Sequence, residues 1–226
     1  MQPSLRSDSH DRLLKARIGL AIRQPFLASA LMRLPFYAIN SVSWCPTMAT
    51  DGYRIYFNPE WVSHLKDIEI RGVLAHELAH IKNKDTKVST IAVLAVALVT
   101  TIADISLRAA FHTRSRGKDS SQLQMIMIGI ALATYLLAVP SALLLRAALS
   151  RQREELADET AVEITRNPAG LRSALEKLNA DTTVVSRSVA AVSHLWIESP
   201  LERGGKSGIL GRLMNTHPPL SDRIEK

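Results

Sequence analysis

The chain has 226 residues, enough for one globular domain with a hydrophobic core and one additional segment. Hydrophobic residues make up 46% of the chain and are concentrated in its middle third. This uneven distribution excludes a soluble domain whose apolar residues are spread evenly along the sequence. The formal charge is +7, yet no nucleic-acid motif accompanies the basic residues, which cluster beside the apolar segments; we therefore expect a lipid bilayer and no nucleic acid as a partner. Cys45 is the only cysteine, so an intrachain disulfide is excluded.

Residues 11–39 predict helix. Their apolar side chains recur at helical spacing, and Pro25 and Pro35 interrupt the pattern. The beginning of the chain carries charges throughout and has no long apolar run, so we do not expect a secretory signal peptide.

A short strand is predicted next. Thr50-Asp51-Gly52 is typical of a turn, and the aromatic and β-branched residues at 53–57 favour a β-strand. An extended peptide can add to such a strand at a sheet edge through backbone hydrogen bonds. We therefore expect a substrate-binding strand that includes Tyr53, Ile55 and Phe57.

A second helical region follows and carries a metal-binding pattern. Asn58-Pro59 predicts an N-cap with proline at the first helical position, and Asp67 can cap a further helix over 68–83. This helix contains His76-Glu77-Leu78-Ala79-His80, whose two histidines are four residues apart and share one face. Both imidazoles can therefore reach one Zn²⁺, and Glu77 can act as the base that takes a proton from a water molecule activated by the metal.

Two apolar stretches come after the histidine helix. Residues 88–103 contain no charged residue, and the stretch continues to 107 after Asp104; residues 120–145 contain none either. A helix needs about 20 mostly apolar residues to cross a bilayer. The two stretches therefore predict a transmembrane hairpin with both ends on one side, joined by the short basic loop 108–119. The alternative is a long buried helical pair in a soluble protein.

The polar segment 150–158 supplies a candidate third ligand. Catalytic zinc sites use three protein ligands and keep one position open. Glu154 and Asp158 are four residues apart, so Glu154 can bind the metal while Asp158 accepts the free N–H of a ligand histidine, with His76 favoured. The alternative is a solvated charged face with ion pairs at the same spacing. Arg153 is expected in the headgroup region with the other charged residues that flank the hairpin.

Two residues near the end of the chain are further candidates. His217 lies in Thr-His-Pro-Pro, where the prolines favour an extended backbone. It can approach the metal as a removable fourth ligand, donate to the oxyanion that develops during hydrolysis, or lie at the surface. Arg223 can pair with a buried carboxylate of the site or lie at the surface as well. Glu77 and His217 are thus the candidate catalytic residues.

Three motifs in this order resemble the HtpX family of membrane metalloproteases, which are gluzincins related to the CAAX prenyl proteases. They are Leu74–Asp85, Ser150–Asp158 and His217–Ile224, with the two apolar stretches between the first two. The resemblance implies zinc, Glu154 as third ligand, a catalytic domain that faces the cytoplasm, and a role in membrane-protein quality control. Family members usually carry a pair of membrane helices before the zinc helix, and no such pair is found here. Residues 16–80 also resemble a metallopeptidase domain found beside von Willebrand A-type domains.

We therefore expect a mainly α fold with a small β-sheet, the α+β fold of gluzincin zincins, plus a two-helix transmembrane hairpin. Residues 1–87 and 150–226 would form the peptidase domain, and 88–149 the hairpin. The expected function is a zinc endopeptidase of a bacterial-type inner membrane, with one Zn²⁺ per chain and misfolded or membrane proteins as substrates. The alternatives are a non-catalytic zinc-containing membrane scaffold or subunit of a larger complex, and a soluble peptidase whose apolar helices form the interface of a homo-oligomer.

Overall fold

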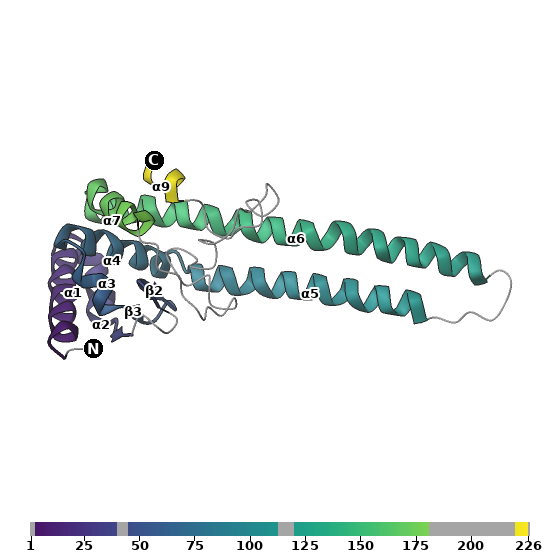
Figure 1. Cartoon of the computed structure of the whole chain (residues 1–226), viewed down its shortest axis with the longest axis horizontal. Helices are drawn as coiled ribbons and strands as arrows, with labels where there is room; N and C mark the ends of the chain where they lie inside the picture. The colour runs from purple at the N-terminus through teal and green to yellow at the C-terminus, as the bar shows by residue number, and fades with distance from the viewer. Residues whose placement is uncertain (1–2, 40–44, 113–119, 181–219, 226) are drawn as a thin grey trace.

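The computed structural model describes residues 3–39, 45–112, 120–180 and 220–225. These residues form a head and an arm (Figure 1). The arm consists of the described residues between 85 and 149, which make two long helices that lie side by side. The head consists of the described residues before and after the arm, and both ends of the chain lie there.

The head begins with two helices and a strand. α1 (Pro3–Arg23) and α2 (Pro25–Arg33) follow the expected helical pattern, and the break between them falls before Pro25. The expectation of helix as far as residue 39 is wrong, because β1 (Phe36–Ala38) is a strand. Leu34 is already extended, with φ −70° and ψ 119°, since the ring of Pro35 disfavours helical backbone in the residue before it.

A three-stranded sheet packs beside these helices. β3 (Ile55–Phe57) lies in the middle, parallel to β1 and antiparallel to β2 (Met48–Thr50). The expected turn between β2 and β3 is confirmed: the Asp51 carboxylate accepts hydrogen bonds from two backbone N–H groups at 2.8 Å, and Gly52 has a φ of +91°. Since both neighbours pair with β3, the expectation that a peptide adds to this strand must be corrected.

The helix that carries the histidines lies at the centre of the head. α3 (Pro59–Ser63) begins as expected, because the Asn58 side chain accepts a hydrogen bond from the N–H of Glu60. α4 (Asp67–Lys82) packs against α1, β2, α6 and α7. Asp67 is its first residue and Lys66 its N-cap, so the helix begins one residue earlier than expected. Most of α4 is therefore buried, including polar side chains of its second half.

α4 crosses α7 (Pro168–Ala180) at very short range. A Cβ atom added to Gly72 would lie 2.7 Å from the backbone nitrogen of Leu171, and one added to Gly170 would lie 2.6 Å from the carbonyl oxygen of Ile68. Glycine at both positions therefore lets the two backbones touch. Nearby, the buried Glu69 carboxylate accepts hydrogen bonds from Lys177 and Ser173 of α7, each at 2.7 Å. The short helix α9 (Leu220–Glu225) packs on α7 as well.

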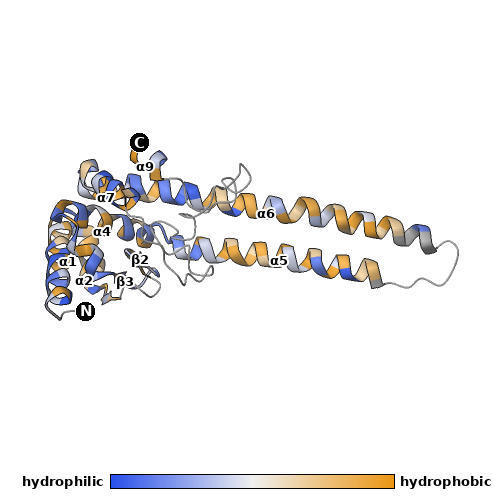
Figure 2. Ribbon diagram, viewed as in Figure 1, coloured by the Kyte–Doolittle hydropathy of each residue, from blue (hydrophilic) through white to orange (hydrophobic). Residues whose placement is uncertain are grey.

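The arm presents apolar side chains to its surroundings. α5 (Asp85–His112) and α6 (Ser120–Thr165) are both long and apolar enough to cross a membrane, judged by length and composition. Figure 2 shows the apolar colour along both helices of the arm, whereas the head alternates between apolar and polar residues. Small side chains are buried along the arm: Ala103, Ala110, Ala131 and Ala147. Such residues let neighbouring helices approach closely.

Most of the large apolar side chains on the arm are exposed, among them Leu98 and Leu136, at 62% and 61%. Within the part of the chain that the structure describes, the arm is thus not a buried helical pair. Asp104 forms an ion pair with Arg108, one turn later on the same helix, at 2.8 Å, so each of these charges has a partner near the far end of α5.

α6 is one continuous helix that runs from the arm into the head, through Pro140. The second apolar stretch and the Glu154 segment therefore belong to the same rod, with no break at residue 150. Helical structure was expected as far as about Leu178, and it continues there in α7 after an interruption at Arg166, whose φ is +50°.

Candidate metal centre

Three potential metal ligands meet where α4 packs against α6. His76 and His80 come from α4, and Glu154 comes from the part of α6 that lies in the head. His76 is fully buried and Glu154 is 1% exposed, while the His80 side chain is 11% exposed. The helical spacing puts both rings on the face of α4 that meets α6, and this packing brings a carboxylate to them across a long stretch of sequence.

The separations between the ligand atoms are those of a small tetrahedral site. The two Nε2 atoms lie 3.1 Å apart; Oε2 of Glu154 lies 3.6 Å from Nε2 of His76, and its other oxygen, Oε1, lies 3.7 Å from Nε2 of His80. One ligand atom from each residue can be chosen so that all three lie within 4.8 Å of one another. Three ligand atoms at about 2.0–2.1 Å from one tetrahedral ion are roughly 3.4 Å apart. The residues present therefore fit a single metal ion without rearrangement of the backbone.

A carboxylate holds the outer nitrogen of each ring. Nδ1 of His76 lies 2.8 Å from Asp158, and Nδ1 of His80 lies 2.6 Å from Asp85. An acceptor at Nδ1 keeps the proton on that nitrogen, so each Nε2 offers its lone pair. The two Nε2 atoms are 3.1 Å apart, so they favour a cation between them, either a shared proton or a metal ion. Burial by itself lowers the pKa of His76, but hydrogen bonds and charge from Asp158 and Glu154 outweigh it and raise this pKa to about 9. The site therefore attracts positive charge.

Glu77 stands next to His76 without a hydrogen-bond partner among the residues that the structure describes. It is 1% exposed, and both carboxylate oxygens are buried. Burial raises its pKa to about 7, although the two histidines act in the opposite direction. A buried carboxylate normally accepts hydrogen bonds, because its desolvation is otherwise uncompensated. Such a group beside a metal centre is typical of one that handles protons.

Arg223 closes the other side of the centre. Its guanidinium donates from Nε and Nη2 to the two oxygens of Asp158, at 2.8 and 2.7 Å, and Nη1 lies 3.4 Å from Glu154. The side chain is 2% exposed. Of the two roles left open by the sequence, the ion pair with carboxylates of the site is therefore the one observed: Glu154 is buried and Asp158 is partly buried. The planar guanidinium fixes both acids at the same time.

A model of a known protein family matches residues 44–226, and its description is Peptidase family M48. The chain belongs to this family. The match spans the histidine helix, the arm, the Glu154 segment and the Arg223 helix, so all parts of the centre lie inside it. The resemblance to HtpX proteases is confirmed.

Curated relatives of this M48 chain are described as protease HtpX homologs. The one from Tropheryma whipplei (strain Twist) is 40% identical over 162 residues, which cover 72% of this chain and 53% of the relative. The one from Dictyoglomus thermophilum is 39% identical over 163 residues, 72% of this chain and 51% of the relative. The chain thus spans about half the length of the curated relatives it matches. No solved structure matches it.

The expected substrate-binding residues of the M48 chain lie on β3 and in the turn before it. Ile55 and Phe57 are fully buried in the core of the head, and Tyr53, in the turn before β3, is 73% exposed. His217 lies outside the described residues. Arg153 is 8% exposed and packs between α5 and α6, so its expected place in the headgroup region must be corrected.

Asp85 is a member of the site that was not expected from the sequence. This residue is 3% exposed and lies at the first position of α5, where its carboxylate reaches back to His80. The signal available in the sequence was an acidic residue five positions after the second histidine, just before an apolar stretch. Periodicity within one helix does not reveal it, because α4 ends and a new helix begins between the two residues.

Proposed function

We propose that this M48 chain is a zinc-dependent endopeptidase with a gluzincin fold, in which His76, His80 and Glu154 hold one Zn²⁺. The observation that supports the proposal best is the pair of Nε2 atoms 3.1 Å apart, with the buried carboxylate of Glu154 beside them. Glu77, next to His76, has no hydrogen-bond partner among the described residues. Two imidazoles and one carboxylate form a donor set typical of catalytic zinc sites.

The residues of the chain would divide the hydrolysis of a peptide bond between them. When bound, Zn²⁺ would polarise the scissile carbonyl and lower the pKa of water. Glu77 takes a proton from the attacking water and passes it to the leaving amine, which suits a carboxylate whose pKa is raised to about 7. Asp158 holds the His76 ring in the tautomer that leaves Nε2 free. His217 remains a candidate donor to the developing oxyanion.

We propose further that the arm, with the rest of 88–149, anchors the peptidase in a membrane. Its exposed apolar faces and continuous backbone hydrogen bonding suit a bilayer. Residues 1–87 and 150–226 would then form one peptidase domain on the side where both ends of the hairpin emerge. By family analogy, that side is the cytoplasm and the substrates are misfolded or membrane proteins of a bacterial inner membrane. An extended peptide would have to pair with one of the two outer strands, β1 or β2, and not with β3. Of these two, β2 is the strand that packs on α4, so we propose β2.

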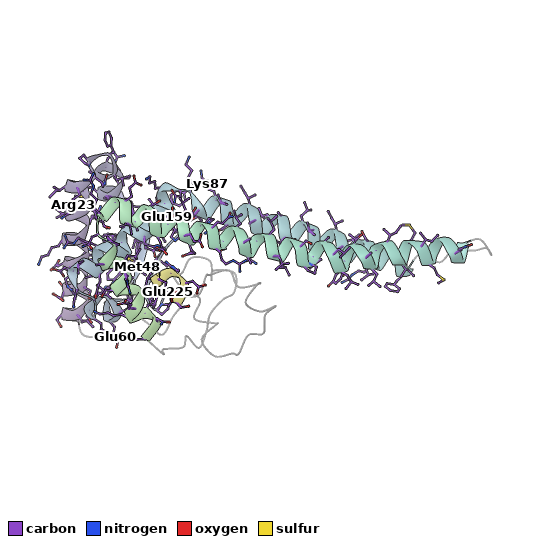
Figure 3. All side chains as sticks on the ribbon, turned by 90° about the horizontal axis from the view of Figure 1, so that it is seen from above. Arg23, Met48, Glu60, Lys87, Glu159 and Glu225 are labelled. Atoms are coloured by element: carbon purple, nitrogen blue, oxygen red, sulfur yellow. The ribbon has the colours of Figure 1, made fainter. Side chains whose placement is uncertain are left out.

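The test is Glu77→Gln in the detergent-solubilised full chain, with the exposed Glu159→Gln on α6 as matched control; Figure 3 labels Glu159 on the head. Glu77→Gln should still bind one equivalent of zinc, because the substitution removes no metal ligand. Its rate of casein cleavage should fall about 10²–10⁴-fold, because the general base is lost. The control should cleave at the wild-type rate. Cleavage by Glu77→Gln at the wild-type rate would refute the mechanism. Zinc bound by a wild-type chain that cleaves no protein would favour a scaffold.

A further inference from the structure

Arg153 completes a ring of buried groups around the candidate metal ligand His80. Its Nε lies 3.6 Å from one oxygen of Asp85, and the other oxygen of Asp85 lies 2.6 Å from Nδ1 of His80. Nε2 of His80 in turn lies 3.7 Å from Glu154, which follows Arg153 directly in α6. Three helices therefore meet in one circuit of charged side chains, and α5 contributes to it through its first residue.

The charged groups of this circuit are buried, so each one needs its partner. Arg153 and Asp85 are 8% and 3% exposed, so neither charge is well hydrated. Each buried charge depends on the opposite one, because the loss of one partner leaves the other desolvated and unpaired. The Asp85 carboxylate is thus shared between a cation on one side and the N–H of His80 on the other.

A second contact of Arg153 ties α5 to α6 at the base of the arm. Its Nη1 donates a hydrogen bond to the hydroxyl of Ser89, which is 4% exposed. Asp85 and Ser89 are four residues apart on α5, so they share the face that meets α6. A small cavity of about 10 Å³, lined in part by Ser89, Ser150 and Arg153, lies at the same level. Arg153 therefore holds the first turn of α5, and with it Asp85, at a set distance from His80.

We propose that Arg153 is a positioning residue for the metal centre, which acts through Asp85 on the orientation of His80. The position of the first turn of α5, at the base of the arm, thereby fixes the orientation of the ligand His80. The inference rests on the proposed metal site, but it makes a separate claim: zinc affinity depends on a residue that does not touch the metal.

The experiment measures the zinc affinity of the detergent-solubilised full chain by competition with a chelator. Arg153→Met should weaken zinc binding about 10- to 100-fold, as is usual when a partner behind a metal ligand is removed. Asp85→Asn should do the same, and the double variant should be no weaker than the weaker single one, because both act on one contact. Arg153→Lys, which keeps the charge, should recover part of the loss. The Co²⁺-loaded absorption spectrum should change in Arg153→Met as well.

Arg17→Met is the matched control. Arg17 is also a buried arginine, 9% exposed, but its guanidinium lies over the ring of Phe36, away from the metal centre. Its loss should lower the melting temperature without a change in zinc affinity. Wild-type affinity in Arg153→Met, or additive losses in the double variant, would overturn the proposal and leave the metal site intact. Unchanged zinc binding in His80→Ala would instead refute the proposed function.

If Arg153→Met does not fold, Ser89→Ala carries the same test. It removes only the hydroxyl that accepts from Arg153, and it should weaken zinc binding in the wild-type background but not in Asp85→Asn. An equal effect of Ser89→Ala in both backgrounds would overturn the proposal.

Discussion

Replacement of Gly72 by alanine places a methyl group in the contact between α4 and α7. The new Cβ would lie 2.7 Å from the backbone nitrogen of Leu171, 2.9 Å from its Cα and 3.0 Å from the carbonyl carbon of Gly170. These atoms belong to the backbone of a second helix, so they cannot rotate away as a side chain can. Ordinary contact begins at 3.4 Å, and the two helices must therefore move apart by about 0.7 Å.

A gap of that size forfeits about a quarter to a half of the dispersion energy of the atoms that face each other. Overpacking of this kind costs about 1–3 kcal/mol, and a backbone clash belongs at the upper end. Alanine is better than glycine in a helix by about 1 kcal/mol, which offsets part of the cost. We therefore expect Gly72→Ala to lower the free energy of unfolding by about 2 kcal/mol, or the melting temperature by about 4–8 °C.

Gly19→Ala is the control for this prediction. Gly19 lies inside α1, and a Cβ there would meet nothing closer than the Arg71 side chain at 3.9 Å. This variant should melt at or slightly above the wild-type temperature, because it gains helix preference without a clash. Thermal unfolding of the metal-free chain in detergent measures both. A Gly72→Ala variant that melts as high as Gly19→Ala would refute the backbone contact.

Three further predictions follow from buried charges and from the arm. Burial alone raises the pKa of Glu69, but hydrogen bonds from Lys177, the Lys66 backbone and Ser173 outweigh it and lower this pKa below 4.5. The ion pair of Glu69 with Lys177 therefore stabilises the fold above that pH and loses its effect as Glu69 becomes protonated. The melting temperature of Lys177→Met should therefore lie below the wild-type value at pH 7, and the difference should shrink towards pH 3. A constant difference would contradict this reasoning. Arg223→Gln should destabilise the metal-free chain by about 3 kcal/mol, since the buried Glu154 and the partly buried Asp158 lose their cation. Zinc should raise the melting temperature of this variant more than that of the wild type, because the metal ion replaces part of the lost positive charge. The chain should remain in membranes washed with alkaline carbonate; its release would make the arm a protein interface.

Local features of the sequence predicted much of the site. His76 and His80 share a face in any α-helix, so their spacing was enough to indicate a metal centre with Glu77 beside it. The Asn58 cap and the two apolar helices are equally local, since a side chain bonds to its own backbone and hydropathy accumulates along one segment. The assignment of Glu154 used the same periodicity, because Asp158 follows four residues later on the same face, and the structure brings Glu154 to both histidines.

Tertiary packing decided the rest. The two hydrogen bonds from Arg223 to Asp158 join helices that are far apart in the sequence. The contact of Asp85 with His80 crosses a helix boundary. Neither contact follows from the periodicity of a single helix. The position of β3 between two partners depends on which strands pair, and a single aromatic strand carries no information about that. Such contacts depend on how the helices and strands pack their apolar faces together. This packing determines which polar groups become buried, and a buried polar group needs a hydrogen-bond or ion-pair partner inside the core.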